Sequence, residues 1–132
     1  MGAVRRSVLE LLAEHGCALS AREVTDTLAA RRSPVSRPSV FRVLEQLDAL
    51  ELVQRVEFGE GVARFEPRWP GGEHHHHLFC ERCSRIVPFH DPALEKAVAG
   101  AARRSEGFAM TAHDITLRGL CDACQAARGH TA

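Results

Sequence analysis

The chain has 132 residues, and 17 basic side chains balance 17 acidic ones, so the formal net charge is zero. This length allows one ordinary domain, or two small ones that lean on each other or on a partner chain. Since no run approaches the roughly 18 apolar residues of a membrane span, and residues 1–16 carry charges where a secretory signal needs an apolar core, we expect a cytoplasmic protein that does not enter the membrane.

Charge is uneven along the chain. Residues 1–42 carry seven arginines against four acids, a balance of +3, whereas residues 43–64 carry two arginines against five acids, a balance of −3. A net charge of zero argues against a protein whose whole surface is covered by a polyanion, but it permits a basic patch on one face. We therefore look for nucleic-acid contacts ahead of Val43.

The first third of the chain predicts three short helices. Apolar residues at helical spacing within 8–12 form the buried face of the first helix, which Gly16 ends. Ser20 and Glu23 match a capping box that opens a second helix. Pro38 fits the first turn of a third, where its missing amide donor costs nothing. Three short helices joined by compact turns indicate a helix-turn-helix.

A different pattern follows. Residues 52–58 and 62–66 alternate between apolar and polar, and the Gly-Glu-Gly stretch at 59–61 can turn the chain, which predicts a β-hairpin. A hairpin appended to a helix-turn-helix is a wing. The segment 67–72 then interrupts all periodicity with two prolines and two glycines, as a hinge does.

Beyond the hinge we expect a small α+β unit. Residues 74–80 and 85–89 read as strands, 92–105 as a helix, and 108–121 as one or two strands. The predicted fold class is therefore α+β: a winged helix-turn-helix domain at 1–66, a hinge at 67–72 and a second domain at 73–132. About 60 residues make a thin core unless a metal or a second subunit adds stability.

Two Cys-x-x-Cys pairs are the most specific chemical motif, and they consist of Cys80, Cys83, Cys121 and Cys124. In a reducing cytosol such pairs indicate metal ligands rather than disulfides, and two pairs complete the tetrahedral shell of structural zinc. A thiol oxidoreductase is the alternative. It is disfavoured because neither pair opens a helix after a strand in a βαβ setting.

Four consecutive histidines precede the first cysteine pair. On a strand, His74 and His76 project to one face while His75 and His77 project to the other, so one strand can supply two ligands to each of two metal sites. Carboxylates from elsewhere would complete each shell. The alternatives are a solvated histidine-rich loop with incidental metal affinity, a metal-buffering protein without DNA function, and a zinc hydrolase with Glu73 as base. Nothing in the sequence suggests the cleft that a hydrolase needs.

The third predicted helix is the candidate recognition helix. Its first turns carry Arg37, Ser39, Phe41 and Arg42. Residues at this end of a recognition helix reach base edges and phosphates, and an aromatic ring can pack on a thymine methyl. In the alternative interpretation the aromatic ring belongs to the core and the arginines form a solvated face.

These motifs together resemble the ferric uptake regulator (Fur) superfamily, including its zinc uptake regulators. The resemblance runs from Val8 to Cys124 and rests on "SRPSVFRVLEQLDALELV", "HHHHLFCERC" and "HDITLRGLCDAC". It implies a transcriptional repressor rather than an enzyme. Such proteins are homodimers with an N-terminal winged helix and a C-terminal dimerisation domain, and they bind palindromic operator DNA when loaded with a divalent metal ion.

The resemblance also implies three ligand sets. The four paired cysteines match the structural zinc site. A second metal site matches His74, His76, Glu95 and His113. The regulatory hinge site matches Glu66, His75 and His77. Ala18 stands where the family has a further hinge histidine, so that ligand is missing. For the sensed ion the histidine run favours zinc, with iron next.

Overall fold

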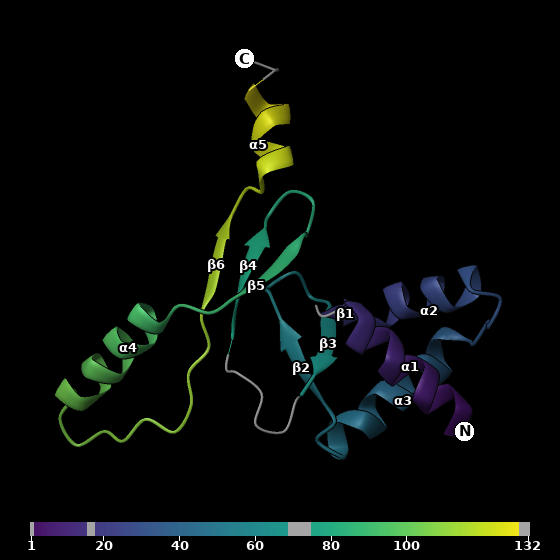
Figure 1. Cartoon of the computed structure of the whole chain (residues 1–132), viewed down its shortest axis with the longest axis horizontal. Coiled ribbons are helices and arrows are strands. Elements are labelled where there is room, and N and C mark those ends of the chain that lie inside the picture. Colours follow the sequence, from purple (N-terminus) through teal and green to yellow (C-terminus); the bar gives the residue numbers. More distant parts are fainter. Residues whose placement is uncertain (1, 16–17, 69–74, 130–132) are drawn as a thin grey trace. The chain divides into compact units, whose positions relative to one another are not determined.

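The computed structural model describes residues 2–15, 18–68 and 75–129 and divides the chain into two compact units, Met1–Gly72 and Glu73–Ala132 (Figure 1). None of the described helices is both long enough and apolar enough to cross a bilayer.

The first unit combines three helices with a small sheet. Its elements, in chain order, are α1 (Gly2–His15), β1 (Leu19–Ser20), α2 (Ala21–Ala30), α3 (Arg37–Ala49), β2 (Val53–Glu57) and β3 (Ala63–Pro67). The sheet has the order β1-β3-β2 with antiparallel neighbours. This is the predicted winged helix-turn-helix, with the β2–β3 hairpin as the wing.

One apolar cluster holds this unit together. The inward faces of the three helices supply most of it, and Val53 and Phe65 add the inner face of the hairpin. Its helical members are Val8, Leu11, Leu12, Ala21, Val24, Leu28, Val40, Val43, Leu44 and Leu47. Their spacing of three and four residues is what the sequence pattern predicted, because only that spacing places side chains on one face of a helix.

Local polar contacts fix where α2 and α3 begin. Ser20 Oγ accepts from the Glu23 amide at 3.1 Å, and Glu23 Oε1 accepts from the Ser20 amide at 3.0 Å, which completes the predicted capping box. Ser36 caps α3 by accepting from the Ser39 amide at 3.3 Å. Arg64 on β3 also forms an ion pair with Glu23, which links the wing to the start of α2.

The second unit has a three-stranded sheet and two helices. Its elements are β4 (His76–Cys80), β5 (Ile86–Phe89), α4 (Pro92–Arg104), β6 (Thr116–Gly119) and α5 (Asp122–Gly129). β4 lies at the centre, antiparallel to β5 and parallel to β6. Its consecutive residues His76 and His77 therefore project to opposite faces of the sheet.

The structure makes two expectations for this unit more specific. Within 108–121 only Thr116–Gly119 is a strand, because a parallel partner of β4 must start at the same end of the sheet, and residues 108–115 carry the chain back there from α4. The second cysteine pair does open a helix after a strand, since β6 leads through Cys121 into α5. That strand and helix are not followed by a further strand, so a βαβ redox setting is still not formed.

Little of the second unit is buried. Among residues 75–129 the buried side chains are those of His76, His77, Phe79 and Cys80. Large apolar side chains at Leu78, Phe108 and Leu117 are exposed. The unit therefore has less apolar burial than the first, as expected for a fold that depends on metal or on a partner.

Candidate metal centres and DNA-contact residues

The four paired cysteines converge at one end of the second unit. The four sulfur atoms all lie within 4.8 Å of one another, and Cys83 Sγ is 3.7 Å from Cys121 Sγ. A tetrahedral zinc ion with bonds of about 2.3 Å has sulfur-to-sulfur edges of about 3.8 Å. All four are free thiols, so the cluster fits one such ion.

Backbone amides favour the negatively charged form of one thiol in this cluster. The amides of Cys83 and Cys121 donate to Cys80 Sγ at 3.5 and 3.4 Å, and they lower the pKa of that thiol to about 6. The neighbouring Cys121 side chain, by contrast, raises the pKa of Cys124 to about 12. Four thiolates this close repel one another, so all four thiols ionise together only when a bound cation offsets their charge.

A second cluster joins β4, α4 and the segment before β6. Glu95 bridges two imidazoles, with one oxygen against His76 Nε2 and the other 2.9 Å from His113 Nε2. The Ile115 amide donates to His76 Nδ1 at 3.2 Å and orients that buried ring. Although burial opposes ionisation, the two histidines lower the pKa of Glu95 below its usual value. His74, expected in this set, lies outside the described residues.

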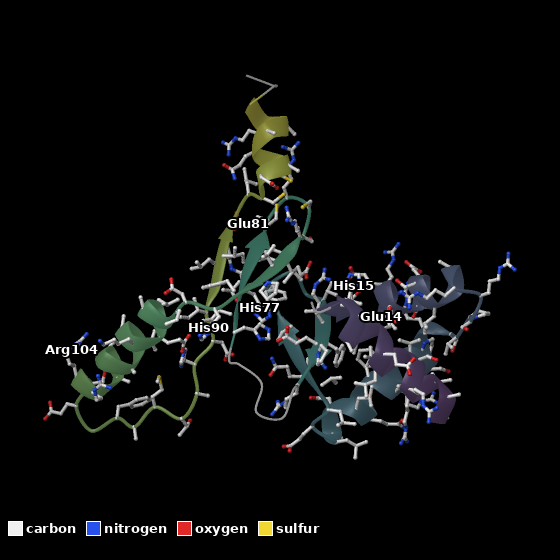
Figure 2. All side chains as sticks on the ribbon, viewed as in Figure 1. Glu14, His15, His77, Glu81, His90 and Arg104 are labelled. Atoms are coloured by element: carbon white, nitrogen blue, oxygen red, sulfur yellow. The ribbon has the colours of Figure 1, made fainter. Side chains whose placement is uncertain are left out.

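The residues expected at the hinge belong to both units. In the second unit the rings of His75 and His77 meet with their centroids 4.9 Å apart. His77 neighbours His76 on β4 and so faces away from the Glu95 cluster. In the first unit Glu66 lies on β3, where Gln54 Nε2 donates to its carboxylate. Ala18 is buried in the first unit and offers no ligand atom. Figure 2 labels His77 among the side chains drawn on the ribbon.

The candidate DNA contacts occupy the first turns of α3. Arg37 and Arg42 are exposed. Phe41 packs edge-on against Phe65 with ring centroids 6.2 Å apart, so much of its ring serves the core. Ser39 Oγ accepts from Ser36 Oγ at 2.9 Å. A hollow of about 360 Å³ opens beside these turns, and its lining consists of Ala21, Arg37, Pro38, Phe41, Arg42 and Glu45.

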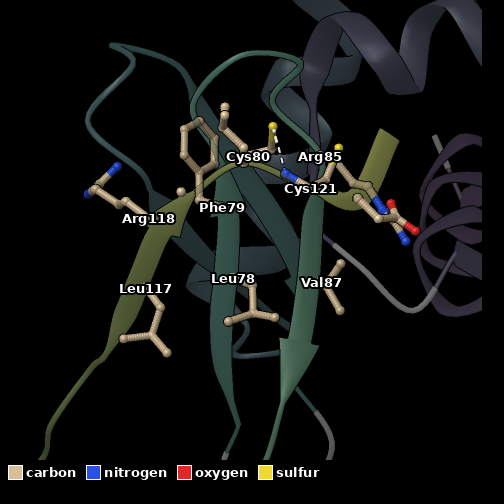
Figure 3. Close-up of a pocket in the computed structure, with 11 residues that line it drawn as sticks. Leu78, Phe79, Cys80, Arg85, Val87, Leu117, Arg118 and Cys121 are labelled. Atoms are coloured by element: carbon tan, nitrogen blue, oxygen red, sulfur yellow. Dashed lines mark hydrogen bonds and ion pairs between the residues drawn. The ribbon is translucent and has the colours of Figure 1, made fainter. Parts of the chain in front are cut away.

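Two features of the second unit were missed at the sequence level. Arg85 and Asp122 form an ion pair at 2.8 Å beside the cysteines. The available indication was their position, since Arg85 lies two residues after the first cysteine pair and Asp122 lies inside the second. The second feature is a row of apolar side chains across the sheet, Val87, Leu78 and Leu117, which lie in register on neighbouring strands beside a hollow of about 440 Å³ (Figure 3).

Comparison with known proteins decides the family. The sequence model of the Ferric uptake regulator family matches residues 1–118. The chain belongs to this family. Membership of the ferric uptake regulator family makes it a metal-dependent transcription regulator rather than an enzyme, so the oxidoreductase and hydrolase alternatives are dropped.

Individual relatives agree. The ferric uptake regulation protein of Bordetella parapertussis is 36% identical over 110 residues, which cover 83% of this chain and 77% of that protein. The Helicobacter pylori ferric uptake regulator, described as having three functional metal binding sites, superimposes with a TM-score of 0.81 at 27% identity, over 93% of this chain and 80% of that one. FurB of M. tuberculosis, a zinc uptake regulator, gives a TM-score of 0.51 at 28% identity over 91% of each chain.

Proposed function

We propose that the chain is a repressor that binds palindromic operator DNA as a homodimer when a divalent cation is bound, with zinc favoured as the sensed ion and iron next. The observation that carries the proposal is the division of neighbouring histidines on β4. His76 joins Glu95 and His113 on one face, whereas His75 and His77 meet on the other. One strand thus serves two separate ligand sets.

The four-cysteine cluster is proposed as the structural zinc site. Its sulfur spacing matches a tetrahedral shell, and four thiolates leave no open position for chemistry. Zinc there would connect the turn after β4 with the start of α5, segments that are 37 residues apart in sequence.

The second site is proposed to use His74, His76, Glu95 and His113. Three imidazoles and one carboxylate suit zinc, iron, nickel or copper rather than calcium or magnesium, which prefer oxygen ligands. A carboxylate that already bridges His76 and His113 supports the proposal, because little rearrangement is needed when an ion replaces the shared protons.

The regulatory site is proposed to consist of Glu66 from the wing strand, His77 from β4 and His75, which directly precedes β4. An ion bound by all three would hold the two units at one angle. In a two-fold dimer that angle sets the distance between the recognition helices, which must be about 34–36 Å to enter successive major grooves. We call the form held at this angle closed and the form without it open. Shifting the population from mostly open to mostly closed requires the ion to bind the closed form more tightly by roughly 5 kcal/mol.

DNA contact is assigned to the first turns of α3. Exposed Arg37 and Arg42 are suited to phosphates or to guanine edges, which arginine can bind with two hydrogen bonds. Ser39 and the outer edge of Phe41 complete the contact set. Since the Phe41 ring also packs on Phe65, its contribution to DNA binding is limited to van der Waals contact with a base.

An apolar row on the sheet of the second unit supports the proposed homodimer. The in-register row of Val87, Leu78 and Leu117 presents apolar surface on one face of its sheet (Figure 3). Exposed contiguous apolar surface of this kind marks an interaction site in a soluble protein. A second copy of the chain would cover it and add the burial that this unit lacks.

Zinc is proposed over iron on the run of four histidines, because ligand chemistry and relatives are compatible with both ions. Neither histidine set contains a thiolate, and cellular availability selects among ions that accept nitrogen and oxygen ligands. The relatives include both kinds, since one similar structure is a Francisella tularensis ferric uptake regulator with iron and another is a zinc uptake regulator. The run of four histidines decides for zinc in this proposal.

Fluorescence anisotropy with a labelled palindromic duplex tests the proposal. The protein that retains only its structural zinc is titrated with DNA before and after addition of Zn(II), Fe(II), Mn(II) or Ni(II). Affinity should rise with the sensed ion and the rise should vanish in His75→Ala and His77→Ala. His90→Ala, an exposed histidine outside all three sets, is the matched control. Equal affinity with and without every ion would refute it.

A further inference from the structure

A carboxylate lies among the arginines of the candidate recognition helix. Glu45 follows Phe41 by four residues and Arg42 by three, so the three side chains share one face of α3. Together with Arg37 they line the hollow of about 360 Å³ beside the first turns of this helix. Glu45 and Arg42 are both exposed, so this face of the helix is open to solvent.

The side chain of Glu45 has no partner within the described part of the chain. Among residues 2–15, 18–68 and 75–129 it forms neither a hydrogen bond nor an ion pair, although Arg42 lies at a spacing that allows one. The next residue differs, because Gln46 accepts from Arg5 Nε at 3.1 Å and thereby links α3 to α1. The carboxylate of Glu45 is therefore available to a ligand outside the chain.

A carboxylate on a DNA-binding surface is unfavourable unless a base compensates for it. The phosphates attract the neighbouring arginines, but the same negative charge repels Glu45. In the major groove a carboxylate can accept a hydrogen bond from an amino group, and N4 of cytosine is the usual donor to glutamate. Phosphate contact thus disfavours this side chain, whereas base recognition favours it.

The position of Glu45 along the helix suits contact with a base edge. Side chains of a recognition helix that contact bases are spaced three or four residues apart over about two turns. Arg42 and Glu45 are about 4.5 Å apart along the axis, since each helical residue rises about 1.5 Å. Base pairs are stacked about 3.4 Å apart. With α3 in the major groove, Arg42 and Glu45 can therefore contact adjacent base pairs.

We propose that Glu45 is a further, specificity-determining residue of the operator contact. Its carboxylate accepts a hydrogen bond from N4 of a cytosine in the base pair adjacent to the one that Arg42 contacts. This inference rests on the proposed function, because it requires the metal-loaded homodimer to bind DNA through α3. Two-fold symmetry predicts that the cytosine occurs once in each half-site of the palindrome.

Selection from a randomised duplex library tests the proposal. Full-length wild type, Glu45→Ala, Glu45→Gln and Glu10→Gln each select DNA in the presence of Zn(II), Fe(II), Mn(II) or Ni(II), and the enriched duplexes are sequenced. Glu10→Gln is the matched control because it removes the same charge from an exposed position on α1. Its motif should equal that of the wild type.

The two variants of Glu45 should change one position of each half-site. Glu45→Ala should lose the preference for cytosine there and retain the rest of the motif, which also shows that the variant is folded. Glu45→Gln should prefer adenine at the same position, because glutamine can bind N6 and N7 of adenine with two hydrogen bonds. A purely structural role of Glu45 would not exchange one preferred base for another.

Anisotropy titrations give the size of the effect. One labelled duplex carries the wild-type motif, and a second has the cytosine replaced by adenine in one half-site. Wild type should bind the first duplex about 5- to 150-fold more tightly than the second. This ratio should fall to about one in Glu45→Ala and below one in Glu45→Gln, and it should be unchanged in Glu10→Gln.

Failure of this inference and failure of the proposed function give different results. A wild-type motif and a wild-type affinity ratio in Glu45→Ala would overturn the role of Glu45 while leaving operator binding intact. An equal gain in affinity for both duplexes would show that the carboxylate only repels phosphates and would also refute the assignment. Wild-type protein that enriches no sequence with any of the four ions would overturn the proposed function and this inference together.

Discussion

Removal of the structural zinc should unfold the second unit and leave the first unit folded. The first unit has a cluster of thirteen buried residues, worth roughly 20–40 kcal/mol at about 1.5–3 kcal/mol each before entropy is counted. In the second unit Phe79 and Cys80 are the buried apolar side chains among residues 75–129, worth roughly 3–5 kcal/mol on the same scale. Structural zinc contributes on the order of 10 kcal/mol, more than that apolar burial.

Cys83→Ser is the perturbation of choice because Cys83 is the exposed member of the set, so the substitution disturbs the zinc shell and little else. Hydrogen exchange read by mass spectrometry should show loss of protection in β4 and β6, while α3 keeps the protection of the wild type. Glu81→Ser, an exposed position in the same turn, is the matched control and should behave as wild type. Full protection of β4 in zinc-free Cys83→Ser protein would refute the reasoning.

Three further predictions concern single side chains. Ser20→Ala removes the cap of α2 and should lower the free energy of unfolding of the first unit by about 1 kcal/mol in urea titration; a change below a few tenths would contradict the capping box. Arg37→Ala should weaken DNA binding and reduce the slope of log K against log salt by about 0.9 per protomer if the arginine contacts phosphate; an unchanged slope would exclude that contact. Leu78→Arg should convert the proposed dimer to a monomer in analytical ultracentrifugation, whereas Leu50→Arg, at an exposed leucine of the first unit, should not.

The sequence predicted the parts of the fold that depend on local chemistry. The capping box at Ser20 and the hairpin around the glycines at 59 and 61, both of which have positive φ, follow from residues within a few positions of each other. The Cys-x-x-Cys spacing likewise identified the sulfur cluster. The cap and the hairpin are each encoded within one short segment, and each half of the sulfur cluster is a short motif of its own.

Features that depend on distant contacts were not predictable in the same way. The bounds of β6 are set by its pairing with β4, so the pattern within 108–121 left the number of strands open. The partial burial of Phe41 depends on Phe65 from the wing, and the orientation of His76 depends on the Ile115 amide. The ion pair of Arg85 and Asp122 joins segments whose proximity is fixed only by the folded sheet.

Anomalous diffraction from crystals of the zinc-loaded protein tests the central claim most directly. The account predicts one metal peak beside His76, Glu95 and His113 and a separate peak beside His75 and His77, on the opposite face of β4, in addition to the peak at the four cysteines. A single ion shared by consecutive histidines, or no ion beside residues 75–77, would contradict it.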